Sequence, residues 1–444
     1  MKRHTSMLLR QAIPVLAFTA AARFTTHASA DYVVHEWGTF TSVQAADGIQ
    51  LEWNSFQALE LPGFVYSVEW PLGRHPGLFN LAGGKQVLMA RQRMETPVLY
   101  FYSPTHLTVD VRVDFPNGRM TEWYPQISFG ERQRPELLNG FLTFGAPTNI
   151  AWNSVAIVGN SEGHSAGTIG LPPSESSPSH YYAAREVDAN LLQLNGGGNL
   201  RQSERFLFYR GVGSFNAPLR VTQAPSIDHR ITAMNEGAAA LSGLVVLEVR
   251  NQKARFKSGP SVLESGATYE VDLGDTGPWR SLPEASREIA AALQTSLVVA
   301  GLFPREADAM VQTWSDSWFN EDGLRCLYVL PKDWVETVLP LRLDPAPRET
   351  VRVMVGRAEL LMPEVEAQLG RFVSEYLESG KPTGKIAASA AVRNLHLGRF
   401  LQPAFHRLIE RSQQPPTWKQ KAFEFMGILL AKSADSGKVL AAAE

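Results

Sequence analysis

Apolar and polar residues alternate with a period of two through much of the chain, from Asp31 to about Asp275. The clearest run is 107–115, where Leu, Val, Val, Val and Phe occupy every second position between polar residues. Successive side chains of a strand point to opposite faces, so this run predicts a half-buried strand. Pro116-Asn117-Gly118 follows it. We therefore expect 119–124 to return as the partner strand of a hairpin.

Comparable runs predict further strands, with turns rich in Gly, Pro and Asn between them, at 33–43, 97–103, 154–158, 205–209, 244–249 and 268–273. Such a series is typical of an antiparallel sandwich. Near Gly277 the period becomes helical, and we predict helices at 282–302, 305–319, 363–380, 397–409 and 418–430, with short strands at 324–330 and 350–361. The prediction is an α+β protein, with an antiparallel β-sandwich-like body at 31–280 and a mixed, mainly α-helical region at 281–444.

Residues 1–30 have the organisation of a secretory signal peptide. Lys2, Arg3 and Arg10 are basic, residues 11–22 are apolar, and 28–30 read Ala-Ser-Ala before Asp31. The apolar stretch is shorter than the roughly 20 residues that span a bilayer. We expect cleavage after Ala30 and a periplasmic or secreted protein. A retained anchor is the alternative, because Arg23 lies between the apolar stretch and the cleavage site.

Composition narrows the possible partners. Without residues 1–30 the chain has 38 Lys and Arg against 44 Asp and Glu, a net charge of −6. That balance, with no basic run, argues against nucleic acid as a partner. No segment after residue 30 is apolar for long enough to predict a transmembrane helix. Cys326 is the only cysteine, so no intrachain disulfide can form, and we expect a buried thiol.

A Glu-Trp pair occurs four times, and it supplies the first candidate site. Residues 36–40 and 52–56 share Glu-Trp-x-[Ser/Thr]-Phe, and the dipeptide recurs at 69–70 and 122–123. On a strand, each pair would place the indole and the carboxylate on opposite faces. One interpretation is Trp in the core and Glu in water. The other is a set of exposed rings that bind sugar, with candidates Trp37, Trp53, Trp70 and Trp123.

The sequence leaves two kinds of catalytic site as alternatives. Paired carboxylates near Trp would suit glycoside cleavage, and the candidates Glu36, Glu95, Glu122 and Glu204 lie on separate predicted strands. No local zinc motif is present, but His35 could begin a distributed metal site with Glu95, Glu122 or His229. No Gly-rich phosphate-binding motif occurs, so no nucleotide cofactor is expected. Any other cofactor is undetermined by the sequence.

Three segments support a resemblance. They are 35–42 (HEWGTFTS), 94–102 (METPVLYFY) and 351–357 (VRVMVGR). They resemble stretches of exported bacterial proteins of similar length to which no activity is assigned. The resemblance implies a bacterial, exported unit and transfers no catalytic residue.

Three hypotheses of function follow. The first is an exported binding or scaffolding protein, with a carbohydrate or another envelope protein as ligand. The second is a periplasmic hydrolase that acts on a glycan or ester through carboxylates or a distributed His/Glu metal site. An enzyme should bring two titratable groups together in a pocket. The third, a structural partner in a complex, predicts an exposed apolar patch around Leu397, Phe400, Leu401 and Phe405.

Overall fold

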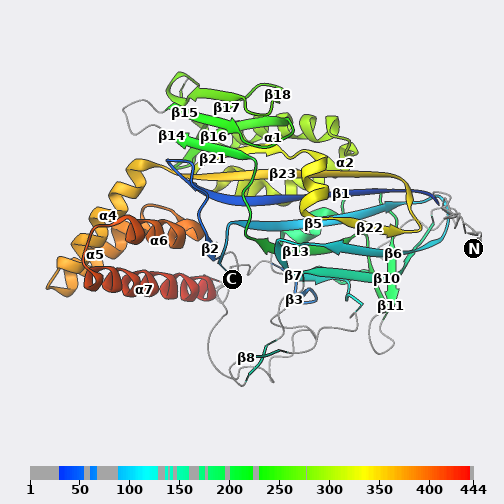
Figure 1. Ribbon diagram of the computed structural model, residues 1–444, viewed down its shortest axis with the longest axis horizontal. Helices are drawn as coiled ribbons and strands as arrows, with labels where there is room; N and C mark the ends of the chain where they lie inside the picture. Colours follow the sequence, from blue (N-terminus) through cyan, green and yellow to red (C-terminus); the bar gives the residue numbers. More distant parts are fainter. Residues whose placement is uncertain are drawn as a thin grey trace, which may run out of the picture.

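The computed structural model describes residues 30–54, 61–67, 89–128, 136–138, 141–143, 148–159, 170–175, 179–195, 201–223, 230–276 and 278–440. The predicted signal peptide lies outside these residues, apart from Ala30. The described chain is an α+β protein, as predicted, with a large sheet followed by helices (Figure 1).

An 11-stranded mixed sheet forms the body of the molecule. Its strands, in spatial order, are β20 (Arg280–Ser281), β17 (Lys253–Ser258), β16 (Leu241–Arg250), β21 (Gly323–Val329), β23 (Pro347–Leu361), β1 (Ala30–Ala45), β5 (Gln92–Tyr102), β13 (Leu207–Gly213), β7 (Gly118–Tyr124) and β3 (Tyr66–Ser67), with β18 (Val262–Leu263) beside β16. The predicted strands at 324–330 and 350–361 thus lie in the middle of this sheet. The main sheet therefore crosses the boundary that the sequence suggested at residue 280.

The first strand pairs in parallel with a strand more than 300 residues later. β1 and β23 run in register from Val33 opposite Glu349 to Ala45 opposite Leu361. The other edge of β1 pairs antiparallel with β5. β1 therefore has a strand on each edge, and all its residues from Val33 to Ala45 are buried.

A second, five-stranded sheet covers one face of the main sheet. Its order is β12 (Arg201–Glu204), β11 (Leu192–Asn195), β10 (Asn149–Ile157), β6 (Leu107–Asp114) and β22 (Leu341–Asp344). One apolar cluster joins the two sheets, with Val111 and Trp152 on one side and Leu99 and Phe101 on the other. The two packed sheets form the sandwich-like body that the sequence predicted.

The hairpin expected at 107–124 does not form. β6 pairs with β10 and β22, whereas β7 pairs with β13 and β3. The turn at 116–118 takes the chain from one sheet to the other. Both strands turn their apolar residues, Val111 and Met120 among them, into the same core between the layers. Burial of that face therefore decides the pairing, and proximity along the sequence does not.

Helices cover the opposite face and one end of the main sheet. α1 (Leu282–Val299) and α2 (Pro304–Ser315) pack on the face away from the second sheet, where Ile289 and Leu293 meet Leu247 and Val329. α4 (Pro363–Glu378), α5 (Pro382–Arg393), η6 (Gly398–Phe400), α6 (Leu401–Arg411) and α7 (Pro416–Leu440) stand together at one end of the sheet (Figure 1). Every predicted helix is confirmed, but α5 and the short α3 (Lys332–Val338) were not predicted.

The remaining described elements are small. A three-stranded sheet consists of β14 (Leu219–Gln223), β15 (Arg230–Asn235) and β19 (Thr268–Asp272), and two pairs join β2 (Trp53–Asn54) to β4 (Met89–Ala90) and β8 (Glu136–Leu138) to β9 (Phe141–Thr143). η2 (His180–Arg185) is a 3-10 helix, and η5 (Asp316–Asn320) is a π-helical turn after α2. Among the described helices, none is both long enough and apolar enough to cross a bilayer.

Candidate ligand-binding cleft

On the helix-covered face of the main sheet, the buried side chains change from apolar to charged toward one end of the strands. On β23, Val353 and Val355 belong to the core under α1 and α2, and the next positions on that face are Arg357 and Glu359. The change follows the period of two, so the charged residues stay on the same face. They are as buried as the apolar ones, with Arg357 fully covered.

The neighbouring strands change in the same way. Val98 and Tyr100 of β5 lie in the apolar core, whereas Glu95 and Arg93 continue the same face beyond the irregular Thr96, which has a φ of 51°. On β21, Leu327 lies in the same apolar core, and Arg325 is the next residue on that face. The register places Arg325 opposite Glu359 and aligns Thr41 of β1 with both Arg93 and Arg357. A band of charge therefore crosses four adjacent strands.

Glu359 is the centre of one half of this band. Its carboxylate accepts from Arg325 Nε at 3.0 Å and from Arg357 Nη2 at 2.9 Å. Arg325 also donates to the carbonyls of Trp318 and Glu321 at 2.9 and 2.6 Å, so it fixes the end of η5 on the sheet. Arg357 Nη2 also reaches the Glu321 carboxylate at 2.7 Å.

Glu95 is the centre of the other half. Its Oε1 contacts Arg93 Nε at 3.0 Å and Arg399 Nη1 at 2.8 Å, and its Oε2 accepts from the Thr41 hydroxyl at 2.8 Å. Arg399 belongs to η6 and lies 3.9 Å from Glu321 through Nη2. Its guanidinium also faces the rings of Phe400 and Trp53, at 5.0 and 5.9 Å from the centroids. Arg399 therefore links the helical end to both halves of the band.

The arginines keep Glu95 and Glu321 ionised. Burial alone would raise the pKa of Glu95, but Arg399, Arg93 and Arg210 outweigh it and hold that pKa well below its usual range. The pKa of Glu321 is lowered in the same way, chiefly by Arg357 and Arg399 against the effect of burial. At neutral pH both of these carboxyl groups are therefore negatively charged.

A hollow that we call the charged pocket opens beside Glu95. It is a cavity of about 320 Å³ between the sheet, η2, η5 and η6. Its charged lining residues are Arg93, Glu95, Arg210, Asp316, Glu321 and Arg399, and His180, Trp314, Ser317 and Asn320 complete it.

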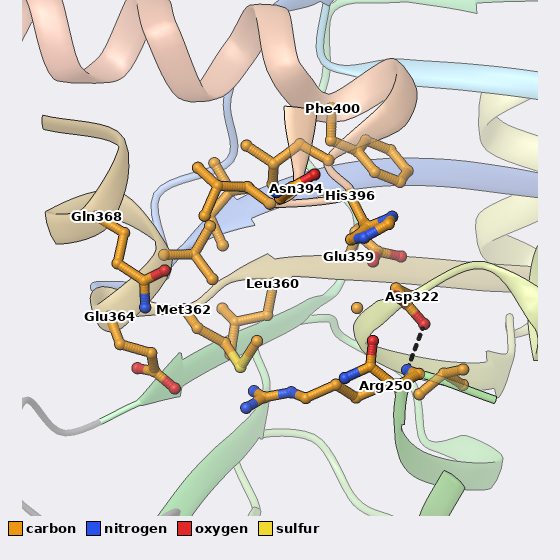
Figure 2. A pocket seen from close by; sticks show the side chains of 17 residues that line it. Arg250, Asp322, Glu359, Leu360, Met362, Glu364, Gln368, Asn394, His396 and Phe400 are labelled. Carbon is orange, nitrogen blue, oxygen red and sulfur yellow. Dashed lines mark hydrogen bonds between the residues drawn. The ribbon is translucent and has the colours of Figure 1, made fainter. Parts of the chain in front are cut away.

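A central hollow adjoins the charged pocket, and an inner hollow adjoins the central one. The central hollow, about 770 Å³, shares Asn320, Glu321 and Arg399 with it and extends along 392–401 to the β16–β17 turn at Asn251 and Gln252. The inner hollow, about 220 Å³, lies between the end of the sheet and α4. Figure 2 shows it with Glu359, His396 and Phe400 on one side and Met362, Glu364 and Gln368 on the other. Together the three form a cleft between the sheet and the C-terminal helices.

The cleft walls include backbone in the left-handed region. Asn251 and Gln252 have φ values of 51° and 60°, which is the form of a two-residue hairpin turn that Asn favours. Asp322 accepts from the Asn251 amide at 3.1 Å, the bond drawn in Figure 2. His396 has a φ of 52° just after α5 ends. These conformations follow from a turn and a helix end, so they are part of the framework of the cleft.

The four candidate carboxylates lie in separate environments. Glu95 lines the cleft, as described. Glu36 is buried between the two sheets, paired with Arg352 Nε at 2.6 Å and hydrogen-bonded by the Tyr209 hydroxyl. Within the described part of the chain, no hydrogen bond or ion pair joins any two of the four candidates.

The other two candidates have local partners. Glu204 is buried and held by Arg185, whose Nη2 lies 2.7 Å from Oε2, and by the Tyr181 hydroxyl at 3.1 Å. Glu122 accepts from the hydroxyl of its neighbour Thr121. The structure therefore does not bring these carboxylates together as a pair for glycoside cleavage.

The candidate tryptophans are core residues. Trp37, Trp53 and Trp123 have exposures of 0%, 0% and 2%, so none presents a free ring face for a sugar. Trp70 lies outside the described residues. The interpretation of Trp in the core holds for these three, but Glu36 is not in water, because both faces of the sheet are covered.

His35 is buried against helix α2. Its Nδ1 lies 2.7 Å from Glu306 Oε2, and its ring packs on Phe303 with 4.4 Å between centroids. Glu306 also accepts from the Phe303 amide at 2.8 Å, so it caps the start of α2. No group of three or more His, Cys, Asp or Glu side chains that could hold a metal exists among the described residues, and His229 is not among them.

The expected apolar patch is not exposed. Phe400, Leu401 and Phe405 have exposures of 5%, 8% and 0% and pack with Leu397 into the core of the C-terminal helices. The third hypothesis therefore loses the surface on which it depended.

Sequence reasoning missed most of the charged pocket. Glu95 was a candidate, but Arg93, Arg210, Glu321 and Arg399 were not. A usable signal was present in 353–359, where every second residue reads Val, Val, Arg and Glu. A buried face that turns charged within one strand is unusual, since charges are rarely buried unless paired.

Comparisons with known proteins assign no family. No family model matches the chain, and no curated protein matches it. Among solved structures, the Fcho1 mu-homology domain of Danio rerio with a bound Eps15 peptide matches with a TM-score of 0.29 and 9% identity, over 76% of this chain and 99% of that one. The yeast delta-COP-I mu-homology domain with a Dsl1 WxWxV peptide gives a TM-score of 0.26 and 8% identity, over 74% and 98%. Similarities this low support no conclusion about function.

Proposed function

We propose that this chain is an exported binding protein that holds a carbohydrate in the cleft between the main sheet and the C-terminal helices. The observation that carries the proposal is the set of three adjoining hollows, 220 to 770 Å³ each, between two packed parts of one molecule. The two larger hollows, about 320 and 770 Å³, have the size of small-molecule sites, which favour such junctions.

The lining suits a sugar. Planar polar side chains, among them Asn251, Gln252, Asn320 and Asn394, alternate around the cleft with apolar ones such as Leu397. Amides donate and accept at the same time, as the hydroxyl groups of a sugar require. Most of these polar residues are exposed, so a ligand can reach them.

The carboxylates of the cleft favour binding over hydrolysis. A glycosidase needs one carboxylic acid whose pKa is raised, so that it can protonate the leaving oxygen. In the charged pocket the two carboxyl groups with a shifted pKa, Glu95 and Glu321, are both shifted downward. They remain ionised, so neither can supply the proton that the leaving oxygen requires.

Export is the second part of the proposal, and it rests on residues 1–30. The test is expression of the full chain in a bacterium, followed by cell fractionation and N-terminal sequencing. We expect periplasmic or secreted protein that begins at Asp31. Recovery only in the cytoplasm with residues 1–30 intact would refute export.

Binding is tested by thermal shift of the purified protein against neutral and acidic disaccharides. A ligand at 100 times its Kd should stabilise the fold by about 2.7 kcal/mol. Asn320→Ala, in the cleft, should weaken the shift, whereas Gln420→Ala, an equally exposed amide on α7, should not. Absence of a shift with every saccharide, or equal effects of the two variants, would refute a carbohydrate site in this cleft.

A further inference from the structure

We propose that the cleft binds an extended chain of several sugars rather than a single sugar or a disaccharide. The inference rests on the proposed function and adds the length of its ligand. It begins from the order of the three hollows. The central hollow shares Asn320, Glu321 and Arg399 with the charged pocket, and it shares Asn251, Asp322 and His396, among others, with the inner hollow. The three therefore form one series with the central hollow in the middle.

The strands that line the series indicate its length. The inner hollow is lined by Val249 of β16, and the charged pocket is lined by Arg210 of β13. In the main sheet, β21, β23, β1 and β5 lie between these two strands. Neighbouring strands are about 4.8 Å apart, so the five spacings from β16 to β13 amount to about 24 Å. One unit of an extended sugar chain is roughly as long as one strand spacing, which gives room for about four to five units.

Each hollow has polar side chains for a sugar unit. The inner hollow has the amide of Gln368, which Figure 2 shows on the α4 side. The central hollow has the exposed amides of Asn251 and Asn320. The charged pocket has the exposed Asp316 and the half-buried Ser317. Its described lining has arginines and carboxylates in equal number, so it favours neither sign of charge on the ligand. A neutral chain can therefore make polar contacts along the whole series.

The sizes of the hollows predict how affinity depends on chain length. A disaccharide should occupy the central hollow, which is the largest at about 770 Å³. Units added at either end should enter the inner hollow and the charged pocket, about 220 and 320 Å³. Affinity should therefore increase with length until the series is filled.

The experiment is isothermal titration calorimetry with the full chain as purified. The probes are neutral oligosaccharides of two to six units from cellulose, xylan and chitin. A net hydrogen bond is worth about fivefold in affinity. In at least one series the Kd should thus fall about fivefold with each added unit up to about four or five units, and then stay constant.

A variant at one end of the series tests the placement of the chain. Gln368→Ala should leave the Kd of the disaccharide unchanged and weaken binding of the pentasaccharide about fivefold. The control is Gln420→Ala, an exposed amide on α7 that lines none of the three hollows, and it should leave both Kd values unchanged. Equal weakening of both ligands by Gln368→Ala, or no difference between the two variants, would overturn the placement.

The outcomes separate this inference from the proposed function. A Kd that no longer falls beyond two units, in every series that binds, would overturn the extended chain and leave a carbohydrate site in place. No binding of any oligosaccharide would overturn both. The length series uses the unmodified protein, so its result does not depend on the folding of a variant.

Discussion

Glu95→Gln should be one of the most destabilising single changes in this protein. Glu95 is 3% exposed and lies within 3.0 Å of Arg93, Arg399 and the Thr41 hydroxyl. The substitution keeps the size of the side chain but removes a buried negative charge that faces the guanidiniums of Arg93 and Arg399. Breaking a buried ion pair in this way costs about 3–5 kcal/mol of unfolding free energy.

The cost should also depend on pH. The pKa of Glu95 is lowered in the folded state, so its stabilising effect is complete above the unfolded-state pKa of about 4.3 and is lost as pH falls. For a carboxyl that stays ionised in the folded state at pH 3.5, protonation of the unfolded chain removes ~1.2 kcal/mol. The difference between the parent protein and Glu95→Gln should therefore be smaller at pH 3.5 than at pH 7.

Urea denaturation at both pH values, followed by tryptophan fluorescence, measures the difference. Glu349→Gln, at an exposed position of β23, is the matched control and should leave the midpoint unchanged at either pH. Adding Arg399→Gln to Glu95→Gln should recover part of the loss, because the two residues share one interaction. A loss below 1 kcal/mol at pH 7, or a gap that widens on acidification, would refute the account of the band as a set of interlocked charges.

Four further predictions concern the framework. Glu306→Gln should lower the unfolding free energy by about 1–3 kcal/mol, because the Glu306 carboxylate caps α2 and hydrogen-bonds to His35. Chemical denaturation measures the loss, and a loss no larger than for the exposed Glu288→Gln would contradict this. Gly356→Ala should destabilise the protein by about 1–3 kcal/mol, since its Cβ would lie 2.2 Å from the Tyr328 ring, and an unchanged midpoint would disprove the close approach. Gly427 lies at an exposed site within α7, where an added Cβ would have no atom within 4 Å. Gly427→Ala should therefore stabilise the protein by up to about 1 kcal/mol in the same chemical denaturation experiment, and a lower midpoint would contradict this. Burial raises the pKa of the Cys326 thiol to about 12, so a thiol reagent at pH 8 should label it only after denaturation, and rapid labelling of the native protein would show that the strand opens.

The sequence predicts local structure well where one face of an element is apolar. The alternation at 107–115 gives β6, and Pro363 with a helical run after it gives α4. The partners of each strand are another matter. A period of two shows which residues share a face, but it does not show which strand lies alongside. Any strand of matching pattern could hydrogen-bond to β1, and in the structure β23 does so. Burial against the layer above, which no local pattern records, makes that choice.

The candidate site shows the same limit. The Glu-Trp pairs allow either core indoles or exposed sugar-binding rings, and the structure buries Trp37, Trp53 and Trp123. The accompanying expectation of carboxylates in water fails for Glu36, because a second layer covers that face of the sheet. Arg399 reaches Glu95 from 304 residues away, and an ion pair between such distant positions leaves no trace in spacing or composition.

The pairing of β1 with β23 also determines when the protein can fold. While the chain is being made, β1 can find β5, but its other edge stays open until residue 361 exists. An open edge in the middle of the future sheet invites pairing with other chains, and contacts of such long separation form slowly. A nascent chain of this protein therefore keeps one edge of β1 unpaired until synthesis reaches residue 361, and that edge is open to aggregation until then.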